Sequence, residues 1–186
     1  MKQYNEKKIC FIIYADNKQY LEECILYLSV LDIPEGYETE LLVVEDSISM
    51  AMGYNEAMNA SDAKYKIYLR QEAFVIERQL VQKVLDIFNT DNKIGMIGAL
   101  GCINLSKDAL VHHSEVCGAL CGAKNYKNGI EIIPVESAIQ EVEIVDDLFM
   151  ATQYDIIWRE DLLDGQEFCK NFCQLQCLQT KHQKTK

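Results

Sequence analysis

Short apolar runs and amphipathic segments alternate along the first hundred residues, and this alternation constrains the fold more than any other feature. The apolar runs are 9–14 (ICFIIY), 40–44 (ELLVV), 65–69 (YKIYL) and 94–100 (IGMIGAL). Runs of this length and composition are typical of strands buried within a sheet. Strands that alternate with helices predict an α/β fold with a mostly parallel mixed sheet flanked by helices.

The segments between these runs carry apolar side chains at helical spacing, so each should pack one face on the sheet. Ser49 is placed to cap the second of them. The apolar positions are Leu21, Cys24, Ile25, Leu28 and Leu31 in the first segment, Met50, Tyr54, Ala57 and Met58 in the second, and Val81, Val84, Leu85 and Phe88 in the third.

The pattern is weaker after residue 100. Residues 102–128 show no clear period and predict a long loop that leads to a hairpin, with strands at 130–135 and 141–145. A chain of 186 residues, of which 49% are hydrophobic and 25% charged, is long enough to form one domain with a substantial core. We therefore expect a single domain over 1–186, with 9–100 as one half, 101–165 as the other and 166–186 as a C-terminal helix and tail.

Acidic and amide side chains stand just beyond three of the predicted strands. Asp16 and Asn17 follow the first, Glu45 and Asp46 the second, and Glu72 the third. Ligands of parallel sheets bind beyond the carboxyl ends of the strands, so these residues form a candidate binding site. The alternative is that Asp16, Glu45 and Asp46 are solvated strand-end residues that help to cap the helices that follow, and that Glu72 is an exposed turn residue.

Four of these segments together resemble the front half of a family-2 glycosyltransferase. They are FIIYADNKQYLEEC, LLVVEDS, MGYNEAM and YLRQEAF. The resemblance implies a Rossmann-like GT-A fold, that of the nucleotide-diphospho-sugar transferases, in which 9–100 binds a nucleotide such as UDP and 101–165 faces the acceptor. It implies that the nucleotide is bound by Asp16, Asn17, Glu45, Asp46, Asn55 and Arg70.

The segment YLRQEAF stands where the family has an Asp-x-Asp turn, whose carboxylates bind a divalent cation that bridges the two phosphates. Arg70 replaces the first acid of that turn, and Glu72 remains. Two interpretations follow from the resemblance. Glu72 binds Mg²⁺ or Mn²⁺, with water and phosphate completing the coordination, or Arg70 itself pairs with phosphate.

The segment EVEIVDDLFMATQYDIIWREDLLDG is similar to the acceptor-side segment of a narrower group of bacterial glycosyltransferase-like proteins. This similarity implies acceptor-side positions for Asp146 and Trp158. Trp158 either stacks on an acceptor sugar or fills the core.

In inverting members of the family, an acid after the Asp-Gly turn acts as the general base. Cys169 or Lys170 stands at that point here, so the nearest candidates for the base are Asp164 and Glu167. The family continues with a further helix and strand, whereas this chain ends in QTKHQKTK. The resemblance therefore predicts a C-terminally truncated or divergent member.

A zinc site is the main competing hypothesis for the C-terminal region. Cys169, Cys173 and Cys177 recur every four residues, with His182 beyond them, and thiolates with imidazole bind zinc. The alternative is an amphipathic helix whose cysteines pack in the core or an interface.

Three glycines near residue 100 also allow two interpretations. Gly95, Gly98 and Gly101 could form a dinucleotide-binding loop or, since they lack the spacing of that loop, allow tight packing within the sheet.

Charge and hydropathy limit the partners. Twenty-nine acidic residues against eighteen basic ones give a net charge of −11, which disfavours nucleic acid and anionic membranes. No apolar run approaches the roughly 20 residues of a membrane span, so we expect a cytoplasmic protein with reduced cysteines.

The predicted function is sugar transfer from a nucleoside-diphosphate sugar to a glycan or other acceptor hydroxyl. The alternatives are an inactive relative that binds a nucleotide or glycan, and a zinc-stapled interaction module.

Overall fold

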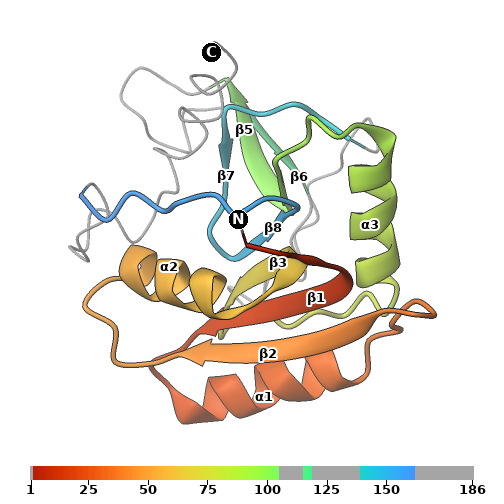
Figure 1. Cartoon of the computed structure of the whole chain (residues 1–186). Helices are drawn as coiled ribbons and strands as arrows, with labels where there is room; N and C mark the ends of the chain where they lie inside the picture. Colours follow the sequence, from red (N-terminus) through yellow and green to blue (C-terminus); the bar gives the residue numbers. More distant parts are fainter. Residues whose placement is uncertain (1, 105–114, 119–138, 162–186) are drawn as a thin grey trace, which may run out of the picture.

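The computed structural model of the chain describes residues 2–104, 115–118 and 139–161 (Figure 1). The helices are α1 (Lys18–Ser29), α2 (Met50–Ala60) and α3 (Leu80–Thr90). The strands are β1 (Asn5–Tyr14), β2 (Glu38–Val44), β3 (Ala63–Arg70), β4 (Met96–Gly98), β5 (Leu100–Asn104), β6 (Glu115–Gly118), β7 (Ile144–Val145) and β8 (Phe149–Thr152).

The main sheet has five strands in the order β2-β1-β3-β8-β4. Strand β1 is parallel to both β2 and β3, whereas β8 is antiparallel to β3 and to β4. Within this sheet β8 therefore runs against the other four strands. The expected α/β class, with a mostly parallel mixed sheet flanked by helices, is confirmed.

Strand β1 is buried on both faces, as its unbroken apolar run predicts. Ile9, Phe11 and Ile13 belong to a core cluster that includes buried side chains of α1 and α3. Cys10 and Ile12 point to the other face and pack with the buried side chains of α2. Because side chains alternate across a strand, β1 contributes to two hydrophobic layers, one under α1 and α3 and one under α2.

The helix boundaries follow local signals in the sequence. Ser49 caps α2, since its side-chain oxygen accepts a hydrogen bond from Met52 N–H (3.2 Å). The four apolar positions predicted for α3 are all buried. Gly53 allows α2 to lie close to the end of β2, because a Cβ at this position would overlap Val44 Cγ1.

Two predictions about strands are wrong. The run 40–44 was expected to be buried on both faces, but β2 is an edge strand, and Leu41 and Val43 are 41% and 38% exposed. Residues 102–128 were expected to form a loop, but residues 102–104 lie in β5 and 115–118 form β6. These strands belong to a second sheet with the order β6-β5-β7.

The second sheet explains the glycines near residue 100. The run predicted as one strand over 94–100 is divided between β4 and β5, and the strand predicted at 141–145 is limited to β7. A Cβ on Gly98 would lie 2.7 Å from Val145 Cβ, and one on Gly101 would lie 2.6 Å from the Ile144 carbonyl oxygen. Of the two interpretations of this segment, tight sheet packing is the one that the structure supports.

Across the described ranges, no helix combines the length and the apolar character that a bilayer-spanning segment needs. The predicted strand at 130–135 and the C-terminal region 166–186 lie outside the described residues.

Candidate functional site

Three neighbouring strands end together at one side of the main sheet. Tyr14 at the end of β1 pairs in register with Val44 of β2 and with Arg70 of β3. Hydrogen bonds continue just past these ends, from Ala15 N–H to the Val44 carbonyl (3.0 Å) and from Gln71 N–H to the Tyr14 carbonyl (3.2 Å). The residues that follow therefore emerge side by side. We call them the carboxyl edge: Asp16, Asn17, Glu45, Asp46, Arg70, Gln71 and Glu72.

Gln71 connects two of the loops at the carboxyl edge. Its side chain is buried, and its Oε1 accepts hydrogen bonds from the backbone N–H groups of Asp16 (3.0 Å) and Asn17 (2.8 Å). Its Nε2 donates to the Asp16 carboxylate and to Glu72 Oε1 (3.2 Å). Gln71 thus fixes the loop between β1 and α1 against the end of β3. Gln71 was not among the predicted site residues, although it stands between Arg70 and Glu72.

Asn17, predicted to bind the nucleotide, caps helix α1 in the structure. Its Oδ1 accepts hydrogen bonds from Gln19 N–H (3.0 Å) and Tyr20 N–H (3.2 Å) at the start of α1. Glu45 and Asp46 are both exposed, and Asp46 has a φ of 54°, which lies in the left-handed region that asparagine and aspartate tolerate. These acids therefore lie at a bend of the chain at the carboxyl edge.

Arg70 lies between two carboxylates. Its Nε donates to Glu72 Oε2 (3.4 Å), and its Nη1 donates to Asp147 Oδ2 (3.3 Å). Asp147 follows β7 and is 8% exposed. The neighbouring Asp146 has a different role, because its Oδ1 accepts a hydrogen bond from Leu148 N–H (2.8 Å) within the turn that leads to β8. Asp146 was the predicted site residue, whereas Asp147 is the one that contacts Arg70.

Burial and the charges of neighbouring groups together set the pKa values of Arg70 and Asp147. Burial alone would lower the pKa of Arg70, but Asp147 and Glu72 raise it overall, so the guanidinium stays charged. Burial raises the pKa of the Asp147 carboxyl, and the nearby Arg70 opposes that shift. The site therefore holds a fixed positive charge in an otherwise acidic region.

The described residues contain no ready-made cluster of side chains for a divalent cation. Among them, no three His, Cys, Asp or Glu side chains converge in a way that could hold a metal ion. Where Mg²⁺ binds beside phosphates, one or two carboxylates usually hold it, and substrate phosphates and water complete its octahedral shell. Glu72 Oε1 accepts a hydrogen bond from Gln71, and Oε2 accepts one from Arg70. Both oxygens of this carboxylate are therefore hydrogen-bonded, and one of them faces the Arg70 guanidinium.

Asn55 and Trp158 lie inside the protein, on the α2 side of the sheet. Trp158 is 1% exposed, and its ring centroid is 5.2 Å from that of Tyr54 and 5.1 Å from that of Tyr68. Asn55 Nδ2 donates to the Trp158 carbonyl (2.9 Å) and to Glu160 Oε1 (2.7 Å), and its Oδ1 accepts from Trp158 N–H (2.8 Å). Asn55 therefore positions the Trp158 segment, and Trp158 fills the core.

The predicted catalytic and zinc-binding residues fall in another part of the chain. They lie outside the described residues: Asp164, Glu167, Cys169, Cys173, Cys177 and His182.

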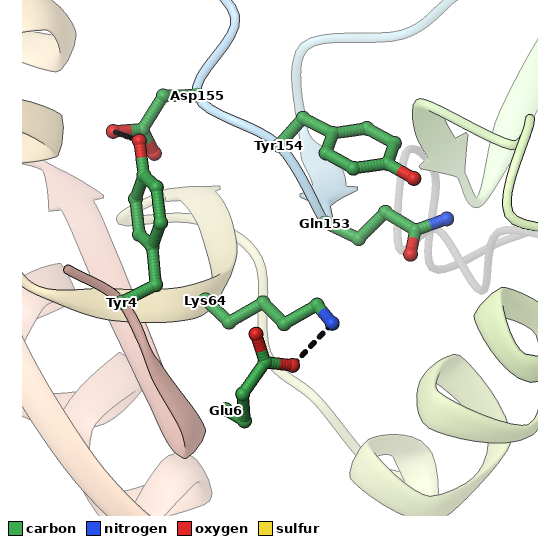
Figure 2. Close-up of a pocket in the computed structure, with 6 residues that line it drawn as sticks. All are labelled: Tyr4, Glu6, Lys64, Gln153, Tyr154 and Asp155. Carbon is green, nitrogen blue, oxygen red and sulfur yellow. Dashed lines mark hydrogen bonds and ion pairs between the residues drawn. The ribbon is translucent and has the colours of Figure 1, made fainter. Parts of the chain in front are cut away.

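A surface hollow lies at the opposite edge of the sheet, near the start of β1 and β3 (Figure 2). Its volume is about 440 Å³. Its polar groups contact one another or the backbone: Tyr4 Oη donates to Asp155 Oδ2 (3.0 Å), and Lys64 pairs with Glu6. None of the predicted site residues lines this hollow, which is formed by Tyr4, Glu6, Lys64, Gln153, Tyr154 and Asp155.

Comparison with known proteins agrees with the resemblance read from the sequence. Two crystal structures of S. aureus TarS 1–349, one in complex with UDP-GlcNAc, are similar to the chain at 10% identity and a TM-score of 0.38. The matches cover 53% of this chain and 36% and 34% of those chains, so the chain spans about a third of their length. No curated protein matches the sequence. The model of a family described as "Glycosyltransferase like family" matches residues 10–186, and the chain belongs to that family.

Proposed function

We propose that the chain binds a nucleoside-diphosphate sugar at the carboxyl edge and transfers the sugar to the hydroxyl group of an acceptor. The observation that carries this proposal is the shared register of Tyr14, Val44 and Arg70, which places three strand ends side by side. Membership of the glycosyltransferase-like family supports the reaction class. Sheets of this kind bind ligands at this edge.

The polar groups at the carboxyl edge suit a nucleoside. The carboxylates of Asp16, Glu45 and Asp46 are exposed and can accept hydrogen bonds from a uracil N–H or from ribose hydroxyl groups. Gln71 holds the loop that carries Asp16, so that acceptor is fixed before the ligand binds. A preorganised site loses less entropy on binding.

The transfer step needs a base on the acceptor side. In the proposed reaction, Asp164 or Glu167 takes the proton of the acceptor hydroxyl as its oxygen attacks the anomeric carbon. A new bond forms between the anomeric carbon and that oxygen, the bond to the diphosphate breaks, and the nucleoside diphosphate leaves with the electron pair. Binding interactions that strengthen in this transition state would raise the rate.

A second candidate is a relative that binds the nucleotide or a glycan without turnover. The replacement of the family's general base by Cys169 or Lys170 favours this candidate. An enzyme and a relative that binds the nucleotide both predict donor binding, and they differ in whether the bond between the sugar and the diphosphate is cleaved.

We expect UDP to raise the melting temperature of the purified chain. Ligand at a hundredfold excess over its Kd stabilises a folded protein by about 2.7 kcal/mol, which corresponds to several degrees in a domain of this size. A thermal-shift assay with UDP, GDP, CDP and ADP, each with and without Mn²⁺, measures this effect. If no nucleoside diphosphate shifts the melting temperature, the proposal is wrong. Hydrolysis of UDP-sugars without acceptor then separates an enzyme from a binding-only relative.

A further inference from the structure

We propose that the Arg70 guanidinium supplies the cationic charge that faces the donor's diphosphate, so that donor binding at the carboxyl edge requires no divalent cation. This inference rests on the proposed function. It follows from a disagreement between the family's pattern, which has a metal-binding Asp-x-Asp turn at YLRQEAF, and the side chains that the structure places there.

Arg70 lies at the β3 side of the carboxyl edge, next to the end of the central strand β1. It is the last residue of β3, it pairs in register with Tyr14, and it precedes Gln71, which binds the loop leading to α1. A diphosphate between a nucleoside bound near Asp16 and an acceptor beyond β3 would pass this position. The chain carries a net charge of −11, and the edge is rich in carboxylates, so a fixed cation here offsets the repulsion of the phosphates.

The guanidinium has hydrogen-bonding capacity left for a phosphate. An arginine side chain offers five N–H donors in a planar fork. Within the described residues, one N–H contacts Glu72 and one contacts Asp147. The side chain remains partly exposed. A planar fork with N–H groups facing solvent matches the paired oxygens of a phosphate.

The two carboxylates have different effects on this arginine. Asp147 is nearly buried and holds the guanidinium from the interior, whereas Glu72 is exposed and lies on the solvent side. Both carboxylates therefore already form ion pairs with the Arg70 guanidinium. A divalent cation placed between Glu72 and Asp147 would meet the positive charge of Arg70 at close range and would be repelled.

The experiment is calorimetric titration of the full chain with UDP, in EDTA and in Mn²⁺. The variants are Arg70→Met, Arg70→Lys and the control Arg78→Met, which removes an exposed arginine that pairs with Asp32. We expect UDP to bind in EDTA with an affinity within about threefold of that in Mn²⁺. Arg70→Met should weaken UDP binding about tenfold or more, as loss of a charged hydrogen bond does, and weaken UMP binding less. Arg70→Lys should retain part of the affinity, and Arg78→Met should retain all of it.

Other outcomes separate this inference from the proposed function. If UDP binds only when Mn²⁺ is present, or if Arg70→Met binds UDP in EDTA as tightly as the wild type, the inference is wrong and the proposed function stands. If no nucleoside diphosphate binds under any condition, both are wrong. A melting temperature of Arg70→Met within a few degrees of the wild type shows that a loss of affinity does not come from unfolding.

Discussion

Replacement of Asp155 by alanine is expected to lower the free energy of unfolding by about 3–5 kcal/mol, because it leaves a buried ammonium group without its counter-charge. Lys66 is 0% exposed, and its Nζ donates to Asp155 Oδ1 (2.5 Å) and to the Ala63 carbonyl (2.6 Å). Asp155 also accepts from Lys2 Nζ (3.1 Å) and Tyr4 Oη (3.0 Å). Urea unfolding of the Asp155→Ala variant measures the loss.

Three further variants test the cause of that loss. Lys66→Met removes the buried charge itself and leaves Asp155 with Lys2 and Tyr4 as hydrogen-bond donors, so we expect it to cost less than Asp155→Ala. Adding Asp155→Ala in the Lys66→Met background should then cost far less than it does alone. Asp32→Ala, which removes an exposed pair with Arg78, should cost below about 1 kcal/mol. Equal losses for Asp155→Ala in both backgrounds would contradict the assignment.

The same ion pair predicts a pH dependence. Burial alone would raise the pKa of Asp155, but the hydrogen bonds from Lys66, Lys2 and Tyr4 lower it overall. A carboxyl whose folded pKa is depressed stabilises the fold above its unfolded pKa of about 3.9 and loses this contribution as pH falls through the folded pKa. The stability difference between the wild type and Asp155→Asn should therefore shrink as the pH falls below about 4.

Replacement of Asn55 by alanine is expected to cost about 2–4 kcal/mol, because it removes three hydrogen bonds and leaves backbone groups of Trp158 without partners. Trp158 is the single tryptophan of the chain and is buried, so its fluorescence reports on this segment. We expect the Asn55→Ala variant to unfold at lower urea concentration, with native emission shifted to longer wavelength.

Asn59 provides a matched control for Asn55. It lies on the same helix, α2, but is exposed. Asn59→Ala makes the same change in helix propensity and should alter stability by less than about 0.5 kcal/mol. A loss of similar size in both variants, with unchanged tryptophan emission in Asn55→Ala, would mean that Asn55 does not anchor Trp158.

Periodic local patterns predicted most of the first hundred residues correctly. The buried run of β1, the Ser49 cap of α2 and the four apolar positions of α3 depend on neighbouring residues and are confirmed. The burial of β2 was predicted wrongly, because strand order determines which strand lies at an edge, and the apolar run 40–44 does not encode that order. Strands β5 and β6 were missed because β5 is short and begins with a glycine-containing segment.

The candidate site could be predicted from the sequence only in part, for a similar reason. The strand pattern of the sequence predicted Asp16, Glu45 and Glu72 at one edge, because each follows a strand of a predicted parallel sheet. It could not pair Arg70 with Asp147, which is 77 positions away and reaches the site through β8, the antiparallel strand beside β3. Trp158 was left between acceptor stacking and core packing, and its contacts with Tyr54 and Tyr68 decide for the core.

Hydrogen–deuterium exchange with and without a saturating UDP-sugar tests the central claim most directly, since it reports where the donor binds. We expect slower exchange in the segments that form the carboxyl edge, at 14–19, 44–49 and 70–74. Exchange should be unchanged around the hollow at the opposite edge, at 2–6, 62–66 and 153–157. Protection confined to the hollow, or no protection at any of the three strand ends, would contradict the account.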